Sequence, residues 1–260
     1  MGKLKLKSKH RLMCGDSTDK EQVDRLMDGC KADMVFTDPP YGMNLDTSYD
    51  NMKGRGPLHK TGGNSYDNVK GDHDDFDSKF ITTIIEEFHY CKEIFLWGFD
   101  YYAELIPNRK SGSVIVWDKR TSESQDEGFG SCFELCWSKN RHKRYLARIL
   151  WAGVFGFNED TKKRLHPTQK PVQLAEWFFD KWGKDKNLIV DLFLGSGSTL
   201  IACEKTNRQC FGMELDEHYC SVIIQRYIDF VGGSSKVLLT SNDGDKTLEE
   251  VFKMRDKKGI

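Results

Sequence analysis

The stretch Asp191-Leu-Phe-Leu-Gly-Ser-Gly-Ser-Thr199 ends an apolar strand predicted at residues 187–193 and opens a helix predicted at residues 198–205. A second strand, predicted at residues 209–215, contains the acid Glu214. This order of strand, glycine turn, helix and acid is typical of a unit that binds an adenosine moiety, because glycines let the turn approach the ligand and the acid binds ribose hydroxyls. Leu200 stands where the dinucleotide fingerprint has a third glycine, which disfavours a nicotinamide or flavin cofactor. A simple tight turn is the alternative.

Strands alternate with helices on the amino-terminal side of this unit. Further buried strands are predicted at residues 11–14, 33–37, 93–97, 113–117 and 132–137, and helices at 19–27, 80–90, 101–106, 170–182 and 218–230. Near-continuous apolar strands are typical of an α/β fold with an open, mostly parallel sheet and helices on both faces. With 260 residues, a single domain is expected across the chain, and the more polar residues 236–260 are expected at its periphery.

The composition indicates a soluble protein. The hydrophobic fraction is 38 %, the mean hydropathy is −0.60, and no apolar run approaches the length of a membrane helix. Eight scattered cysteines without a C-x-x-C pair are typical of thiols in a reducing cytoplasm rather than of zinc sites or disulfides, so a cytoplasmic location is expected. No targeting segment is expected from the lysine-rich amino terminus.

A second stretch, Asp38-Pro39-Pro40-Tyr41, follows the strand predicted at residues 33–37. The residue before a proline is pushed out of the helical region, and a proline has no N–H for a ladder. The chain therefore leaves the strand with a directed carboxylate, a backbone carbonyl and an aromatic ring, which together suit an amino group on a flat ring. The alternative is an ordinary strand-ending turn. If the strands before Asp38 and Gly195 flank the point where strand order reverses, the two stretches become neighbours.

A basic segment separates these two stretches. The segment from Lys139 to Lys170 contains nine basic residues and only two acids, Glu159 and Asp160, and aromatic residues are interleaved among them. This pattern predicts a surface that follows nucleic-acid phosphates, with a solvated face as the alternative. A polar, glycine-rich passage at residues 42–75 is predicted to be a mobile loop that orders over a ligand beside Tyr41, with a dispensable insertion as the alternative.

Three motifs together resemble one family. Asp38-Pro-Pro-Tyr41, His166-Pro-Thr-Gln-Lys-Pro171 and Asp191-x-Phe193-x-Gly195-x-Gly197, in this order, resemble the DNA amino-methyltransferases of the β-type circular permutation. In that group the catalytic half precedes the S-adenosylmethionine half, and a target-recognition segment lies between them. The resemblance implies a Rossmann-like, circularly permuted methyltransferase fold that uses S-adenosylmethionine, acts on double-stranded DNA and needs no metal.

The resemblance also implies roles for individual residues. In the catalytic motif Asp38, Pro39, Pro40 and Tyr41, the Asp38 carboxylate and the Pro39 carbonyl would accept hydrogen bonds from the exocyclic amino group, and Tyr41 would stack on the extruded base. Cofactor binding is expected from Asp16, His166, Thr168, Lys170, Asp191, Phe193, Gly195, Ser196, Gly197, Ser198, Thr199 and Glu214. DNA binding is expected from the basic residues of a short target-recognition segment, residues 139–165, namely Lys139, Arg141, Lys143, Arg144, Arg148, Lys162, Lys163 and Arg164.

The acceptor follows from the same resemblance. In this family an Asp at the first motif position tends to accompany adenine and a Ser cytosine, so Asp38 favours adenine N6 over cytosine N4. The sequence has no Pro-Cys dipeptide, which disfavours methylation of a cytosine carbon. Two competing hypotheses are RNA or a protein glutamine amide as the acceptor, and a nucleic-acid-binding protein on an inactive methyltransferase fold. A homodimer and a cognate restriction endonuclease are the protein partners that the resemblance implies.

Overall fold

The computed structural model describes residues 3–6, 10–40, 80–120, 122–126, 131–151, 165–166, 168–234, 237–241, 244–247 and 250. The strands are β1 Lys3–Leu6, β2 Arg11–Cys14, β3 Met34–Thr37, β4 Glu93–Trp97, β5 Ser113–Asp118, β6 Phe133–Ser138, β7 Leu146–Arg148, β8 Leu188–Asp191, β9 Gln209–Glu214, β10 Val237–Ser241 and β11 Gly244–Thr247. The α-helices are α1 Lys20–Met27, α2 Phe80–Glu87, α3 Phe99–Tyr102, α4 Val172–Trp182, α5 Ser198–Lys205 and α6 Glu217–Val231, and short 3₁₀ helices are η3 Ala103–Leu105, η4 Arg109–Ser111 and η5 Glu123–Gln125.

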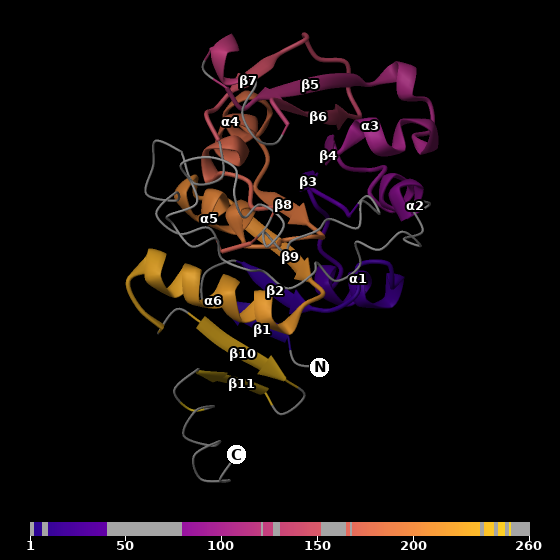
Figure 1. Ribbon diagram of the computed structural model, residues 1–260. Helices are drawn as coiled ribbons and strands as arrows, with labels where there is room; N and C mark the ends of the chain where they lie inside the picture. Colours follow the sequence, from indigo (N-terminus) through magenta and orange to yellow (C-terminus); the bar gives the residue numbers. More distant parts are fainter. Residues whose placement is uncertain are drawn as a thin grey trace, which may run out of the picture.

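The described strands form one sheet in the order β11-β10-β1-β2-β9-β8-β3-β4-β6-β5-β7 (Figure 1). Its centre is parallel, because β2, β9, β8, β3 and β4 pair in parallel with one another. Antiparallel pairs follow on both sides, at β1 with β2 and at β4 with β6. Because β6 runs against both β4 and β5, the strands β5 and β7 run the same way as the central strands. The predicted mostly parallel α/β sheet is confirmed.

Alternating side chains of the central strands bury two cores on opposite faces of the sheet. Phe36 and Phe95 point to the face covered by α4, α5 and α6. Val35 and Ile94, one residue earlier in each strand, point to the face covered by α1, α2 and α3. Figure 1 shows these two helical layers on either side of the strands. Successive side chains of a strand point to opposite faces of the sheet, so strands that are apolar along their length expose apolar side chains on both faces. The two layers of helices cover these faces.

The helix ends follow from local capping chemistry. Asp19 accepts hydrogen bonds from the backbone N–H groups of Glu21 and Gln22 and so caps α1, and Asp216 accepts from the N–H of His218 at the start of α6. Gly232 ends α6 in the left-handed conformation, at φ 76°. The helix predicted from residue 170 begins instead at Val172, because Pro171 is extended, at φ −69° and ψ 142°, and is the N-cap.

Strands at the edges of the sheet were not predicted from the sequence. Residues 236–260 were expected only as a polar periphery, yet β10 and β11 extend the sheet beyond β1, which itself was not predicted. The short strand β7 lies inside the basic segment and pairs in parallel with β5. The helix predicted at residues 101–106 is α3 followed by η3. Ladder pairing holds the edge strands in place. The sequences of β7 and β11 have little apolar pattern, whereas β1 alternates Lys with Leu and β10 contains Val237-Leu-Leu239, so these two strands were missed although the sequence indicates them.

Five of the eight cysteines are buried and none of the eight is in a disulfide. Within the described part of the chain, no helix is both long and apolar enough to cross a membrane.

Candidate active site

The carboxyl ends of β3 and β8 lie side by side in the centre of the sheet, on the edge that is formed by strand ends and not by an outer strand. The two strands pair in parallel, with Met34 opposite Ile189 and Val35 opposite Val190. From β3 the chain continues to β4 on one side, and from β8 it continues to β9 on the other, so the strand order reverses between them. Open α/β sheets bind their ligands at this position. The turn at Asp38-Pro39-Pro40, called the Asp38 elbow below, and the Gly195 turn are therefore neighbours, although about 150 residues separate them in the sequence.

The glycine turn after β8 is held by the acid at the end of β9. Gly195 and Gly197 have φ values of +53° and +80°, which favour glycine. The Gly195 N–H donates to Glu214 Oε2 at 2.8 Å, and the Asp216 N–H donates to Glu214 Oε1 at 2.9 Å. Burial raises the pKa of Glu214 to about 6, and these two N–H groups oppose the increase. Two backbone N–H groups thus fix the orientation of the Glu214 carboxyl group beside the glycine turn.

The turn that contains Asp16 adjoins Glu214 from the β2 side. The Gly15 N–H donates to the Glu214 carbonyl at 3.0 Å, and Cys14 lies opposite Glu214 in the ladder. Asp16 Oδ1 accepts from the backbone N–H of Thr18 at 2.8 Å and from its hydroxyl at 2.7 Å. The structure therefore brings Asp16 to the same edge as Gly195 and Glu214.

Residues before α4 cover the glycine turn. A Cβ atom on Gly195 would lie 3.6 Å from the His166 ring, which itself packs on Tyr219 with ring centroids 4.3 Å apart. Ser198 Oγ donates to the Lys170 carbonyl at 2.6 Å. Thr168 is exposed, and its backbone N–H lies 3.2 Å from His166 Nδ1. The His166 motif and the glycine motif thus form one structural unit.

Arg226 of α6 also holds the glycine turn, and it was not predicted from the sequence. One guanidinium nitrogen donates to the Ser196 carbonyl at 2.9 Å, to Ser196 Oγ at 3.0 Å and to Ser198 Oγ at 3.2 Å. No motif signals this contact, because Arg226 looks like an ordinary polar position of an amphipathic helix.

Asp191 links the glycine turn to β3. Its Oδ1 accepts from the Thr37 hydroxyl at 2.8 Å and from the Phe193 N–H at 3.1 Å. The Thr37 oxygen in turn accepts from the Leu192 N–H at 3.1 Å. Burial raises the pKa of Asp191 to about 6, while the hydrogen bonds from Thr199 and Thr37 oppose the increase. Asp191 therefore connects strands, and this position was predicted only as a cofactor contact.

The Asp38 carboxylate lies in a row of alternating charges. The Lys170 ammonium contacts Asp38 Oδ2 and lies 3.3 Å from Glu134 Oε2. The Lys119 ammonium contacts the other oxygen of Glu134. Burial lowers the pKa of Lys170, but Asp38 and Glu134 outweigh burial and the net shift is upward. For Glu134 the two lysines outweigh burial, so its pKa is lowered. Lys170 and Glu134 are thus both held in their charged forms.

Comparison with known proteins assigns the family. A family model described as DNA methylase, N6_N4_Mtase, matches residues 32–226, which include β3, the basic segment, the His166 motif and the glycine turn. The chain belongs to this DNA methylase family. Over 236 residues it is 26 % identical to the type II methyltransferase M2.DpnII of Streptococcus pneumoniae, a match that covers 75 % of this chain and 81 % of the relative.

Other relatives are more distant or match a shorter part. The type II methyltransferase M.HinfI of Haemophilus influenzae is 21 % identical, over 75 % of this chain and 62 % of the relative. The orphan methyltransferase M.BamHII of Bacillus amyloliquefaciens is 27 % identical over 97 residues, which cover 36 % of this chain and only 37 % of that protein.

Two solved structures share the fold of this methylase. The M1.HpyAVI-SAM complex superposes with a TM-score of 0.53 at 17 % identity, over 83 % of this chain and 98 % of that one. The cytosine-N4-specific PvuII DNA methyltransferase superposes with a TM-score of 0.52 at 13 % identity, over 85 % and 87 %. The expected methyltransferase fold is confirmed.

The basic segment of the methylase is divided between opposite edges of the sheet. Lys139 follows β6, which runs against β4, so Lys139 lies at the edge opposite Asp38. Its ammonium donates to the carbonyls of His89 and Cys91, which gives Lys139 a structural contact. Arg148 lies opposite Asp118 at the end of β5, on the same edge as Asp38. Lys143 and Arg144 are exposed between these two positions.

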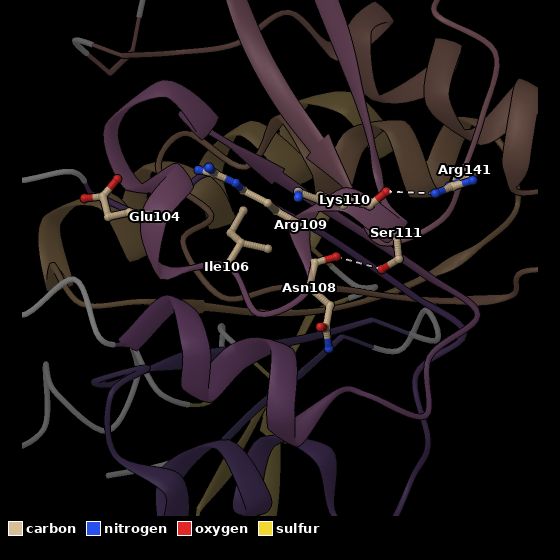
Figure 2. A pocket seen from close by; sticks show the side chains of 7 residues that line it. All are labelled: Glu104, Ile106, Asn108, Arg109, Lys110, Ser111 and Arg141. Atoms are coloured by element: carbon tan, nitrogen blue, oxygen red, sulfur yellow. Dashed lines mark hydrogen bonds between the residues drawn. The ribbon is translucent and has the colours of Figure 1, made fainter.

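Arg141 lines a hollow at the edge opposite Asp38. Its guanidinium donates to the Lys110 carbonyl at 3.2 Å. Figure 2 shows the hollow, which has a volume of about 750 Å³ and is lined by Glu104, Ile106, Asn108, Arg109, Lys110, Ser111 and Arg141. Among these residues only Arg141 was predicted from the sequence, because the other basic residues precede β5 and join Arg141 only in the folded chain.

Several predicted positions lie outside the described residues. They are Tyr41, the passage at residues 42–75, and Lys162, Lys163 and Arg164. Their assignments stay predictions.

The raised pKa of Asp191 predicts a specific pH dependence of stability. A carboxyl whose pKa is higher in the folded state than its usual 3.8 binds more protons when folded, so stability falls as pH rises from about 4 to about 6. Asp191→Asn should remove up to about 3 kcal/mol of this pH-dependent fall. Urea unfolding of both proteins at several pH values between about 4 and 7 measures the difference. If the free energy of unfolding changes equally with pH in the two proteins, the assignment of this pH dependence to Asp191 is wrong.

Proposed function

We propose that this methylase transfers a methyl group from S-adenosylmethionine to the N6 amino group of an adenine extruded from double-stranded DNA. The single observation that supports this best is the position of Asp38, whose elbow ends β3 beside the glycine turn that ends β8. The Asp38 elbow, which suits an amino group, and the Gly195 turn, which suits a nucleoside, thus lie at the same ends of neighbouring strands. An enzyme that transfers a group from a cofactor to a base requires this proximity.

The chain's own residues fit the cofactor. Gly195 and Gly197 give the turn its positive φ values, and a Cβ atom on Gly197 would lie 3.1 Å from Ile223, so glycine lets α6 pack closely under the turn. Each oxygen of Glu214 accepts one backbone N–H, and a carboxylate oxygen has a second lone pair for a ribose hydroxyl. Asp16 lies beside Glu214 on the adenine side of this arrangement, and His166, Thr168 and Phe193 lie around the turn. The M1.HpyAVI structure, which shares the fold, was solved as a complex with SAM.

The mechanism follows from the chemistry of the amino group. When bound, S-adenosylmethionine supplies an electrophilic sulfonium methyl group. The lone pair of an aromatic amine is delocalised into the ring and attacks poorly. The Asp38 carboxylate and the Pro39 carbonyl would accept hydrogen bonds from its two N–H groups and turn the nitrogen towards tetrahedral geometry. This positioning would direct the lone pair at the methyl carbon for an in-line displacement, in which the N–C bond forms as the C–S bond breaks, the neutral thioether leaves and the amino nitrogen gives up one of its N–H protons.

The base must leave the duplex before it can reach Asp38, because the stack hides its reacting atom. We assign stacking on the extruded base to Tyr41, next to Pro40. Arg148 is a described basic residue at the edge of Asp38, and with Lys162, Lys163 and Arg164 it would bind backbone phosphates. Lys139 is left out of this surface because two carbonyls occupy its ammonium at the opposite edge.

The choice of adenine rests on Asp38 at the first motif position. In the family that the motifs resemble, Asp at this position tends to accompany adenine. Cytosine N4 is the second candidate, and a specific finding favours it, since the PvuII enzyme that shares the fold is cytosine-N4-specific.

The arrangement of the halves is a further part of the proposal. The catalytic strand β3 precedes the cofactor strand β8 in the chain, in the order expected for the β-type circular permutation. The type II relatives support a role beside a cognate restriction endonuclease. A homodimer would let two subunits contact one duplex.

Expression in a host without adenine methylation tests the proposal. Genomic DNA is digested to nucleosides and methylated bases are measured by mass spectrometry, with the Asp38→Ala variant as the matched control. N6-methyladenine is expected with the wild-type protein and should vanish with the variant. N4-methylcytosine would keep the mechanism and overturn the choice of base. Absence of any methylated base, with S-adenosylmethionine still bound, would overturn DNA as the substrate.

A further inference from the structure

We infer that Glu134, with Lys119 behind it, is a positioning residue that gives the Lys170 ammonium a second carboxylate and so lets Asp38 be released to the target base. The inference rests on the proposed function, because it concerns the access of an amino group to Asp38. Neither Glu134 nor Lys119 belongs to the three motifs that the sequence displays.

The geometry places Lys170 between two carboxylates. Its ammonium contacts Asp38 at the end of β3 and lies 3.3 Å from Glu134 Oε2 near the start of β6. The same ammonium lies over the Trp97 ring, 5.5 Å from its centroid. The side chains of Lys170 and Glu134 are 14 % and 29 % exposed, so both charges have lost most of their water. A small displacement of the ammonium exchanges one carboxylate for the other.

This exchange strengthens Asp38 as a hydrogen-bond acceptor. In the structure the Lys170 ammonium contacts Asp38 Oδ2 and neutralises part of the carboxylate charge, whereas the proposed reaction requires the same carboxylate to accept a hydrogen bond from the base. Removing the partner of a buried cation is costly, because the charge has neither water nor a counter-ion. Glu134 lowers that cost, since Lys170 keeps a carboxylate partner while the amino group of the base approaches Asp38.

Lys119 sets how strongly Glu134 attracts Lys170. Its ammonium contacts Glu134 Oε1 and lies over the Trp117 ring, 5.0 Å from the centroid. Lys119 neutralises part of the Glu134 charge, so Glu134 shares Lys170 with Asp38 and does not remove it completely. Charges along the row Lys119, Glu134, Lys170 and Asp38 alternate in sign, and each neighbour therefore tunes the next.

Other titratable groups face this row. Tyr102, Cys136 and Asp191 face Asp38, Cys136 also faces Lys170, and Tyr101 faces Glu134. Burial raises the pKa of Tyr102, Cys136 and Tyr101, so these three groups stay neutral through the acid range. Asp191 is common to every variant below, so a difference between variants reports on the row itself.

Two substitutions with opposite expected effects test the inference. Glu134→Gln removes a negative charge and leaves Lys170 more fully on Asp38, which favours the ionised form of Asp38. In a plot of kcat against pH, the loss of activity on the acid side should therefore move to lower pH. Lys119→Gln strengthens the attraction of Glu134 for Lys170, so the acid limb should move to higher pH. In Glu134→Gln, kcat/KM for DNA should also fall about 10-fold, the size expected for loss of one charged hydrogen-bond partner, while the Kd for S-adenosylmethionine stays the same. Glu134→Asp should restore part of the loss.

A matched control is available on α4. Glu176 also pairs with a lysine, Lys205, and its side chain is 25 % exposed, close to the 29 % of Glu134. Glu176→Gln should leave kcat/KM and the pH profile unchanged. Thermal unfolding of each variant identifies any substitution that acts only by destabilising the fold.

A second measurement does not require activity. The Lys170 side chain is followed by NMR through a pH titration of the protein without DNA. Its pKa should be lower in Glu134→Gln and higher in Lys119→Gln than in the wild-type protein. Normal methylation and an unchanged Lys170 titration in Glu134→Gln would overturn the inference. If the wild-type protein methylates no DNA while Lys170 titrates as expected, the proposed function fails and the sharing of Lys170 stands.

Discussion

Replacing Asp38 by Ala is expected to lower the rate of methyl transfer by at least about 10²–10³-fold, the size observed when one aligned polar contact to a transition state is removed. Without its carboxylate, the site no longer accepts the hydrogen bond that turns the amino nitrogen towards the methyl group. The fold should survive the change, because the Lys170 ammonium keeps Glu134 as a partner 3.3 Å away.

Single-turnover rates and equilibrium binding of S-adenosylmethionine separate the two functions of the site. Asp38→Ala should keep nearly the wild-type Kd for the cofactor, because Glu214 and the glycine turn are intact. Asp180→Ala removes an exposed acid of α4 and should leave both quantities unchanged. If cofactor affinity falls as far as the rate in Asp38→Ala, the division between a catalytic strand and a cofactor strand is wrong.

Replacing Phe178 by Ala is expected to reduce the free energy of unfolding by about 3–5 kcal/mol, the usual cost of deleting a buried phenyl group. Phe178 of α4 is fully buried, and its ring lies 5.1 Å from that of Phe36, 4.9 Å from that of Phe95 and 5.5 Å from that of Trp97. These three rings belong to β3 and β4, close to the strand ends that place Asp38 and support Lys170. The cavity would therefore loosen the site as well as the core.

Urea unfolding at fixed pH measures the effect, and the same chemical change at an exposed position provides the control. Phe230 of α6 is 45 % exposed, so Phe230→Ala should alter stability by no more than about 0.5 kcal/mol. A loss in Phe178→Ala that is no larger than the loss in Phe230→Ala would show that α4 is not packed on the sheet as described.

The sequence predicted the parts of the site that have local signatures. The apolar strands, the glycine turn and the Asp38 elbow each depend on neighbouring residues, and the rule that ligands bind where strand order reverses placed them together. Contacts between residues distant in the chain could not be predicted in this way. Arg226 at Ser196 and Glu134 at Lys170 become neighbours only through the packing of α6 and β6 on the rest of the fold.

The basic segment shows the same limit from the opposite direction. Lys139 and Arg148 are similar in charge and close in sequence, so composition alone groups them as one surface. The strand directions place them at opposite edges of the sheet. The edge strands β7 and β11 were missed for a related reason, because they are held by pairing with neighbours and have little apolar pattern of their own. β10 contains three consecutive apolar residues, Val237-Leu-Leu239, and was missed in spite of this signal.

The buried hydrogen bonds of Asp191 have one consequence for the affinities of the two ligands in the proposed reaction. Thr37, one residue before Asp38, and Phe193, two residues before Gly195, donate to the same carboxylate oxygen. In the proposed reaction, a shift of the turn assigned to the cofactor would therefore be transmitted through Asp191 to the residue assigned to the base. Two binding events joined in this way are thermodynamically reciprocal: by whatever factor S-adenosylmethionine tightens the grip on the extruded base, the base tightens the grip on S-adenosylmethionine.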